Sequence, residues 1–266
     1  FYSKRRDWLF GYFSYDLKNE IEDLKSNNKD NFIADNLSFF IPEYVILFNN
    51  NKLEIQTYHS RELCNRFVET FNVLDLPIDN PNIHFNRRDA KKIYLKKIKK
   101  IKAHIQKGDI YEMNYCQEFY STGNKILAES VFLDLNAKMN APFSSFLKLK
   151  EICVLSTSPE RFLRKTKNNI LSQPIKGTRK RGKTKKEDDN LIKELKMSSK
   201  DISENVMIAD LVRNDLSISA KKSSVKVHEL CKVYTFKHVH QMVTSIISEI
   251  DKDVNFTDIL KGAFPM

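Results

Sequence analysis

The chain is poor in the residues from which nucleotide-binding and zinc-binding loops are commonly built. Only six of its 266 residues are glycine, and neither Gly-x-Gly-x-x-Gly nor Gly-x-x-x-x-Gly-Lys-Ser/Thr occurs, which disfavours a nucleotide-binding fold. The four cysteines form no Cys-x-x-Cys pair, so neither a disulfide framework nor a zinc site is indicated. No run is long and apolar enough to span a bilayer, and the first residues lack the apolar core of a signal peptide. We therefore expect a soluble, cytoplasmic protein without membrane contact.

The excess of basic residues raises the question of nucleic-acid binding. The formal net charge is +11 and the pI is about 9.3, and a clustered basic surface is the electrostatic footprint of such proteins. The densest lysine run, however, places Tyr94, Ile98, Ile101 and Ile105 on one helical stripe with lysines outside it, which is typical of an ordinary surface helix. We expect no nucleic-acid partner, although the positive field could attract an anionic metabolite.

Composition and patterning predict one large domain over residues 1–266. The chain is 41% hydrophobic and long enough to bury a sizeable core. Strands are predicted at 37–48 and 52–58, joined by an Asn-rich turn, at 152–156 and 161–165 as a second pair, and at 170–173. Helices are predicted at 89–107, 127–137, 187–196 and 200–214. Residues 225–233 and 238–250 are ambiguous or strand-like, and 76–88 resemble a linker. Because strands and helices occur in separate runs, the fold class is predicted to be α+β.

The most informative segment runs from Ser172 to Gly182. Pro174 favours extended backbone at the residue before it, Gly177 permits a tight turn or a close approach to a ligand, and Lys176 lies between them at the mouth of the predicted turn. A lysine partly removed from water beside other cations loses its proton more readily and can act as a nucleophile or base. A solvated basic hairpin loop is the alternative, and the spacing alone leaves both open.

The helix predicted over 200–214 is apolar around almost its whole circumference, so we expect it to be buried on most sides. Buried charges are costly unless they are paired or bound to metal. Arg213 can pair with the aspartates near it, whereas Glu204 has no basic partner at helical spacing except Lys200.

Five blocks of sequence, in order, resemble the chorismate-binding enzymes. They are Gly108–Asn114, Ser158–Phe162, Ser172–Gly182, Asp201–Leu216 and, as the opening of a block, Lys261–Met266. The family includes anthranilate synthase component I, aminodeoxychorismate synthase component I, isochorismate synthase and salicylate synthase. The resemblance implies a layered sandwich of two large antiparallel sheets with flanking helices and the active site between the sheets. It also implies that the domain is incomplete at its C-terminus, and we expect the same at its N-terminus.

Lys176 distinguishes the branches of this family. The resemblance implies that many anthranilate and isochorismate synthases carry a small residue here, whereas the aminodeoxychorismate synthase branch often carries lysine. It then implies that Lys176 adds to C2 of chorismate as the C4 hydroxyl leaves, that Glu160 protonates this hydroxyl, and that ammonia attacks C4 and expels the lysine. Glu112 supports the same branch. Isochorismate and salicylate synthases resemble one another in having, at the matching position, a lysine that activates water for attack at C2. An ionised glutamate is a weaker base than a neutral lysine, so attack by water is disfavoured here. The expected product is 4-amino-4-deoxychorismate, for the folate and para-aminobenzoate pathway.

The resemblance assigns four further residues. Gly177 and Thr178 follow the family pattern for substrate contact, and Gln241, which replaces a more usual histidine, could form a hydrogen bond to the leaving hydroxyl. Glu204 matches a Mg²⁺ ligand, and this ion keeps several waters and takes one or two protein carboxylates. The implied cofactor is therefore Mg²⁺.

The expected partners are chorismate and a glutamine amidotransferase subunit. The sequence contains no Gly-x-Cys-x-Gly nucleophile elbow, so we expect glutamine hydrolysis on a separate chain. Two alternatives stay open: anthranilate synthase component I, which converts chorismate to anthranilate and pyruvate, and a non-catalytic fragment that binds without turnover.

Overall fold

The computed structural model describes residues 7–28, 31–32, 34–71, 83–251 and 253–264. The chain divides into two compact units, residues 1–75 with 135–266 and residues 76–134. Each unit is described by itself, and the single domain over 1–266 stays a prediction. Much of the predicted linker at 76–88 lies outside the described residues.

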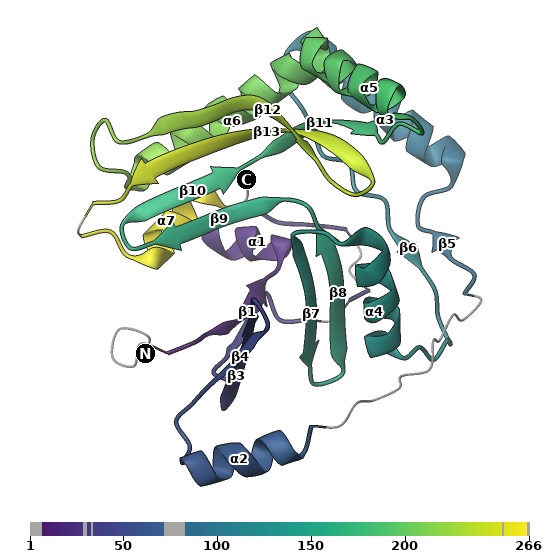
Figure 1. Cartoon of the computed structure of the whole chain (residues 1–266). Coiled ribbons are helices and arrows are strands. Elements are labelled where there is room, and N and C mark those ends of the chain that lie inside the picture. Colours follow the sequence, from purple (N-terminus) through teal and green to yellow (C-terminus); the bar gives the residue numbers. More distant parts are fainter. Residues whose placement is uncertain (1–6, 29–30, 33, 72–82, 252, 265–266) are drawn as a thin grey trace. The chain divides into compact units, whose positions relative to one another are not determined.

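The larger unit contains a five-stranded antiparallel sheet (Figure 1). Its strands are β9 (Arg161–Thr166), β10 (Asn169–Gln173), β11 (Ile175–Lys180), β12 (Lys226–Thr235) and β13 (Val239–Glu249). The long strand β13 pairs with β12 along one edge, while β10 and β11 follow one another along the other edge, and β9 pairs with β10. Pro174 separates β10 from β11 because proline has no amide hydrogen to donate to the ladder.

Three helices pack with this sheet: α5 (Lys185–Met197), α6 (Ser199–Ser219) and α7 (Phe256–Ala263). Each begins at a polar residue whose side chain accepts a hydrogen bond from a first-turn backbone amide, namely Thr184, Ser198 and Asn255. Such caps satisfy amides that have no partner within the helix. Both α5 and α6 contact β11, β12 and β13.

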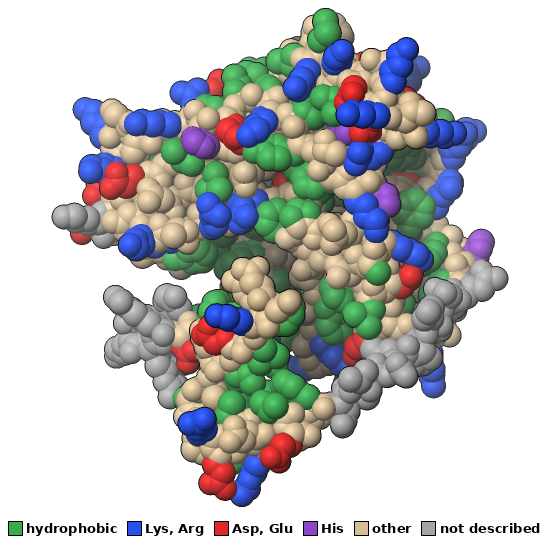
Figure 2. Space-filling view, viewed as in Figure 1, with side chains coloured by type: hydrophobic (Ala, Val, Ile, Leu, Met, Phe, Trp, Pro, Cys, Tyr) green, Lys and Arg blue, Asp and Glu red, His purple; other side chains and the backbone are tan. Residues whose placement is uncertain are grey.

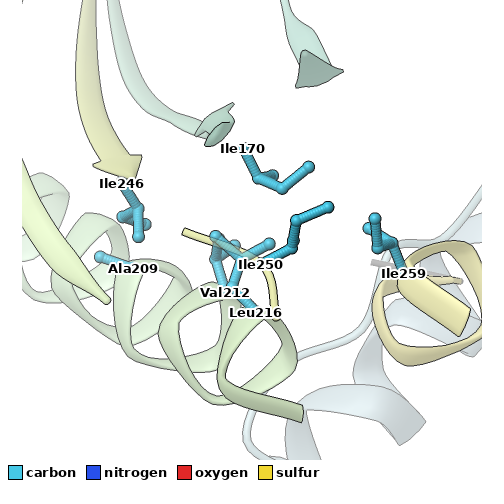
Figure 3. Packing of buried hydrophobic residues seen from close by; sticks show 7 residues of the cluster. All are labelled: Ile170, Ala209, Val212, Leu216, Ile246, Ile250 and Ile259. Carbon is cyan, nitrogen blue, oxygen red and sulfur yellow. The ribbon is translucent and has the colours of Figure 1, made fainter. Parts of the chain in front are cut away.

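The core lies between α6, α7 and the sheet (Figure 3). Its buried members are Ile170, Ala209, Val212, Leu216, Ile246, Ile250 and Ile259. The prediction that α6 is buried on most sides is wrong. Its buried residues recur at helical spacing along one face, from Asp201 to Ser219, whereas Val206, Leu211 and Ile218 are exposed. The face of one sheet covers only one side of a helix. The apolar residues of α6 occur around most of its circumference, so the sequence did not show which side would be buried.

The other described strands form four two-stranded antiparallel pairs. These are β1 (Phe10–Phe13) with β2 (Leu37–Phe40), β3 (Tyr44–Asn49) with β4 (Lys52–Thr57), β5 (Asn86–Arg87) with β6 (Phe119–Tyr120), and β7 (Phe143–Leu149) with β8 (Ile152–Ser158). The α+β class is confirmed, but the expected sandwich of two large sheets is not found among the described residues. In each pair, the two strands form backbone hydrogen bonds only with each other within the described part of the chain. A second large sheet would require such hydrogen bonds between the pairs. The strand at 152–158 pairs with 143–149, so it is not the partner of 161–166 as the sequence suggested.

The remaining described helices are short or belong to the smaller unit. They are a 3₁₀ turn at Tyr15–Leu17, α1 (Lys18–Ile21), α2 (Arg61–Glu69), α3 (Lys91–Lys107) and α4 (Ala128–Met139). Two local predictions are confirmed. The predicted Asn-rich turn between β3 and β4 uses Asn50 and Asn51 at positive φ. The helix predicted over 89–107 ends at Lys107, followed by Gly108 with φ of 80°, the left-handed geometry that glycine adopts without strain.

Basic and apolar side chains are both visible on the surface. On the face shown in Figure 2, Lys and Arg side chains are interspersed with acidic and apolar ones. Within the described part of the chain, no helix combines the length and the apolar character needed to cross a membrane.

Candidate functional site

Lys176 lies in an irregular part of strand β11 rather than in a turn. Ile175 pairs with Val243 and Thr178 with Gln241, and the register shifts between these pairs. Two residues, Lys176 and Gly177, therefore occupy the space opposite one residue of β13, which defines a β-bulge. The predicted basic turn is wrong, but the prediction of unusual backbone holds, because Gly177 has φ of 90°. Lys176 is half-buried.

Gly177 is required by helix packing as well as by backbone geometry. A Cβ atom at this position would lie 3.0 Å from Cβ of Asp201 and 3.1 Å from Cδ1 of Leu195. The start of α6 and the end of α5 thus pack directly against the bulge. Arg179 strengthens this contact, since its Nη2 donates to Oδ2 of Asp201 at 2.9 Å and its Nε to Oε1 of Glu194 at 2.8 Å.

Glu160 is held beside the residue that precedes Lys176. It lies in the connection between β8 and β9, and its Oε1 accepts a hydrogen bond from the backbone amide of Ile175 at 2.8 Å. Its own amide donates to Oγ of Ser158 at 3.2 Å, which fixes the connection locally. The carboxyl group is exposed, so a proton can reach it from solvent.

Thr178 and Gln241 are direct neighbours on β11 and β13, and directly opposite residues in a sheet project from the same face. Thr178 is exposed and Gln241 is half-buried. Oε1 of Gln241 is buried and has no hydrogen-bond partner among the described residues. Buried acceptors without a partner are uncommon in folded proteins, so this oxygen suits a donor supplied by a bound molecule.

Glu204 and Asn205 lie on the part of α6 that approaches the bulge. Glu204 is 40% exposed and its Oε1 lies 3.4 Å from Nζ of Lys200, the partner expected from sequence. Asn205 is 1% exposed, and its Nδ2 donates to the carbonyl oxygens of Lys176 and Met242, at 3.3 and 3.0 Å. Over the described residues, no three His, Cys, Asp or Glu side chains gather to form a metal-binding group.

A second polar cluster, which sequence reasoning missed, ties the end of β11 to α5. Asp188 accepts three hydrogen bonds from Arg181, at 2.7, 3.0 and 3.1 Å, and one from the amide of Gly182 at 2.6 Å. It also lies 2.8 Å from Nε2 of the fully buried His240. The Arg181 guanidinium, helped by the Gly182 amide and His240, holds the pKa of this carboxyl far below its ordinary value. The cluster fixes β11 next to β13, one residue away from Gln241.

A small cavity of about 160 Å³ lies beside these residues. Its walls are Pro142, Phe143, Pro159, Arg161, Gln173, Ile175, Tyr234, Phe236 and Val243. The six predicted site residues are not among them, although Arg161 adjoins Glu160 and Ile175 adjoins Lys176. Burial, together with Arg164, lowers the pKa of Arg161. No described carboxylate forms an ion pair with it, and its Nε donates to Oε1 of Gln173 at 3.0 Å. The cavity therefore has mostly apolar walls, with the guanidinium of Arg161 and the polar side chains of Gln173 and Tyr234 among them.

The missed residues differ in how visible they were in the sequence. Asn205 is an amide within an otherwise apolar run and could have been noticed as a buried polar group. Arg161 directly follows Glu160 in a block that was already selected. Asp188 lies in a run of charged residues at the start of α5, and nothing in that run singles it out.

Comparisons with known proteins identify relatives of this chain. The profile of the chorismate binding enzyme family matches residues 2–266. Aminodeoxychorismate synthase component 1 of Escherichia coli (strain K12) is 30% identical over 259 residues, covering 96% of this chain and 56% of that protein. Anthranilate synthase component 1 of Aquifex aeolicus (strain VF5) is 29% identical over 283 residues, covering 97% and 56%.

The fold is also found in a solved structure. Anthranilate synthase component I from Streptococcus pneumoniae TIGR4 superimposes with a TM-score of 0.82 at 20% identity, covering 97% of this chain and 60% of the other. The chain spans little more than half the length of the curated relatives that it matches. Because the family profile covers nearly the whole sequence, the chain belongs to the chorismate-binding enzyme family.

Proposed function

We propose that this chain provides catalytic residues for the amination of chorismate at C4. The observation that carries the proposal is the bulge in β11 at the half-buried Lys176, directly after Ile175, whose amide donates a hydrogen bond to the Glu160 carboxylate at 2.8 Å. The Glu160 carboxylate, from the connection between β8 and β9, is thereby held at the backbone of the residue that precedes Lys176. The similarity to aminodeoxychorismate synthase component 1 supports the same reaction.

In the proposed mechanism the neutral amine of Lys176 forms a bond to C2 while the C4 hydroxyl departs. Glu160 donates the proton that makes this hydroxyl leave as water. Ammonia then forms a bond to C4, and the bond between Lys176 and C2 breaks, which returns the amine. The balance is chorismate plus ammonia giving 4-amino-4-deoxychorismate plus water, and the lysine splits one difficult displacement into two easier ones.

Thr178 and Gln241 are proposed to contact the substrate. Their side chains project from one sheet face, and Oε1 of Gln241 can accept a hydrogen bond from a substrate hydroxyl without losing a partner within the described chain. Gly177 is proposed as a backbone contact, although its packing against Asp201 and Leu195 already explains why glycine stands there.

Mg²⁺ binding is proposed for Glu204 alone. Its carboxylate is partly accessible and is of the ligand type that Mg²⁺ prefers, but the described residues bring no group of three acidic, His or Cys side chains together. One carboxylate does not constitute a site, so no step of the mechanism is assigned to the metal. Isothermal titration of the complete protein with Mg²⁺, compared with Glu204→Gln, would test this ligand.

The ammonia is proposed to come from a glutamine amidotransferase subunit. The relatives are named as component 1 of their synthases, which suggests a second component. A cytoplasmic location is part of the same proposal. The alternative activity is anthranilate synthesis, favoured by the 29% identity to the Aquifex aeolicus enzyme.

Product analysis in the complete protein, with chorismate and ammonium as substrates, distinguishes these activities. We expect 4-amino-4-deoxychorismate; anthranilate with pyruvate would contradict the proposal. Lys176→Ala should slow turnover by roughly a thousandfold, or about 4 kcal/mol in the barrier. The matched control is Lys180→Ala, which removes an exposed lysine from the same strand and should leave the rate unchanged. Unaltered turnover in the Lys176 variant would exclude the covalent step.

A further inference from the structure

Asn205 lies at the point where α6 meets two irregular strands. The register of β11 against β13 shifts at Lys176 and Gly177, and that of β12 against β13 shifts between Glu229 and Lys232. Cys231, inside the second shift, has φ of 50°. Strand β13 is therefore flanked by a bulge on each edge, and Asn205 contacts residues of both.

The amide group of Asn205 has a partner in every direction. Its Nδ2 donates to the carbonyl oxygens of Lys176 and Met242, and its Oδ1 accepts from Oγ1 of Thr244 and from Sγ of Cys231, the latter at 3.6 Å. Because carbonyl oxygens can only accept, this network leaves one orientation of the amide. A fully satisfied amide that is 1% exposed is rigid and costly to displace.

The two carbonyl contacts occur where the ladder between β11 and β13 is interrupted. A bulge leaves backbone groups without their usual strand partner, and a buried carbonyl without a partner is unfavourable. Asn205 gives one hydrogen to each strand at this interruption, so it stabilises the bulged register against the regular one. A shift of one residue would turn each side chain of this segment toward the other face, and Lys176 would turn with it.

We infer that Asn205 is a positioning residue that holds the bulge and thereby directs the amine of Lys176. The chemical role of that amine rests on the proposed function. Its position in the structure is independent of the proposed function. The residue touches no reacting atom, and its effect passes through the backbone of Lys176. Its neighbour in the helix is Glu204, so the same turn of α6 carries both the proposed ligand and the residue that fixes the proposed nucleophile.

The test uses two substitutions and a matched control in the complete protein. Asn205→Asp keeps an acceptor for Thr244 but cannot donate to the two carbonyls, and Asn205→Ala removes all four contacts. Ser248→Ala is the control, because Ser248 lies on β13, is 3% exposed, and its hydroxyl has no hydrogen-bond partner among the described residues.

The first readout is independent of catalysis. Acetic anhydride labelling of Lys176, quantified by peptide mass spectrometry against the other lysines, should change about threefold or more in both Asn205 variants. Amide hydrogen exchange over residues 175–178 and 241–243 should accelerate about tenfold or more, with slower segments unchanged. Ser248→Ala should match the wild type in both measurements.

The second readout is kinetic. Misplacement of a reacting group by about 1 Å can lower the rate about a hundredfold, so kcat should fall on that scale while KM changes less than about threefold.

Unchanged labelling and exchange at the bulge in folded Asn205 variants would overturn the inference. If neither variant folds, Thr244→Val decides. It removes one of the two donors to Oδ1 of Asn205 and leaves the Cys231 thiol as the other, so intermediate changes support the inference and wild-type values overturn it. Wild-type turnover by Lys176→Ala would instead contradict the proposed role of Lys176 as nucleophile. The labelling and exchange measurements would still test whether Asn205 holds the bulge.

Discussion

The five-stranded sheet and helices α5, α6 and α7 are here called the sheet region. This region and strands β1 to β4 differ in how far their apolar side chains are exposed. In the sheet region Ile170, Leu216, Met242, Ile246 and Ile259 are at most 1% exposed. Strands β1 to β4 instead leave many large apolar side chains at the surface; examples are Phe10, Phe39, Phe40, Ile46, Phe48 and Leu53. Isolated two-stranded pairs are marginally stable in water, whereas a sheet covered by helices has a closed core.

Polar contacts differ between the two regions in the same way. Asn205 and Asp188 each bind several partners in the sheet region and join strands to helices. In the other region the contacts are local or exposed, such as Trp8 Nε1 to Gln56 Oε1 at 2.6 Å. Five of the six candidate residues lie in the sheet region, and Glu160 immediately precedes it. Accurate placement of reacting groups requires the rigid neighbours that this region provides.

The largest expected contrast concerns core packing. Leu216→Ala removes a side chain that is 1% exposed and should lower the free energy of unfolding by about 3–5 kcal/mol, because transfer and cavity costs add. Phe48→Ala removes a larger side chain that is 75% exposed and should change it by less than about 0.5 kcal/mol. Urea unfolding of both variants measures the difference. Equal losses would show that β3 is covered in solution.

Local signals accounted for much of the fold. Asn50 and Asn51 at the hairpin, Gly108 at the end of α3 and the proline at 174 each constrain the backbone through their own chemistry. The helix at 91–107 and the paired Arg213 and Asp210 follow from spacing along a single element. Lys176 and Gly177 were recognised for the same reason, since the unusual backbone lies within two residues.

Other features depend on contacts between distant residues and were not predictable. The segments 225–233 and 238–250, which were ambiguous or strand-like in the sequence, are strands β12 and β13, and their pairing with each other fixes this assignment. Asn205 binds carbonyls 29 and 37 positions away, and no periodicity reveals such a partner. The exposed side of α6 follows from where the sheet lies. The role of Asp188 appears only once β11, β13 and α5 meet.

A smaller contrast is expected for ion pairs. Arg179 is 24% exposed and bonds to Asp201, whose side chain is 10% exposed, so Arg179→Ala should cost about 1.5–3 kcal/mol as a charge-assisted contact is lost near the core. Arg66 and Glu62 on α2 are 68% and 75% exposed, and Arg66→Ala should cost less than about 0.5 kcal/mol. Thermal unfolding at low and high salt checks both. A large, salt-independent loss for Arg66 would contradict the comparison.

Two glycines with positive φ separate backbone strain from crowding. Gly123→Ala should cost about 1 kcal/mol, because φ of 74° disfavours a side chain although nothing lies within 4 Å of the added Cβ. Gly177→Ala should cost about 1 kcal/mol more, since its Cβ would also crowd Asp201 and Leu195. Chemical denaturation gives both values. Equal costs would mean that α5 and α6 yield easily at the bulge.

The smallest expected effect is on acid sensitivity, and it depends on Glu229 in β12. Lys232 and Tyr234 lower the pKa of its carboxyl to about 2, from an ordinary 4.5, and Ser245 on β13 donates to it at 3.3 Å. Since the folded pKa lies below the unfolded one, the stabilisation is complete above about pH 4.5 and is lost as the pH falls toward 2. Glu229→Gln should therefore reduce the melting temperature most at neutral pH and match the wild type near pH 2. A difference that stays constant from pH 7 to pH 2 would show that the interaction does not depend on ionisation, and that shape rather than charge joins these two strands.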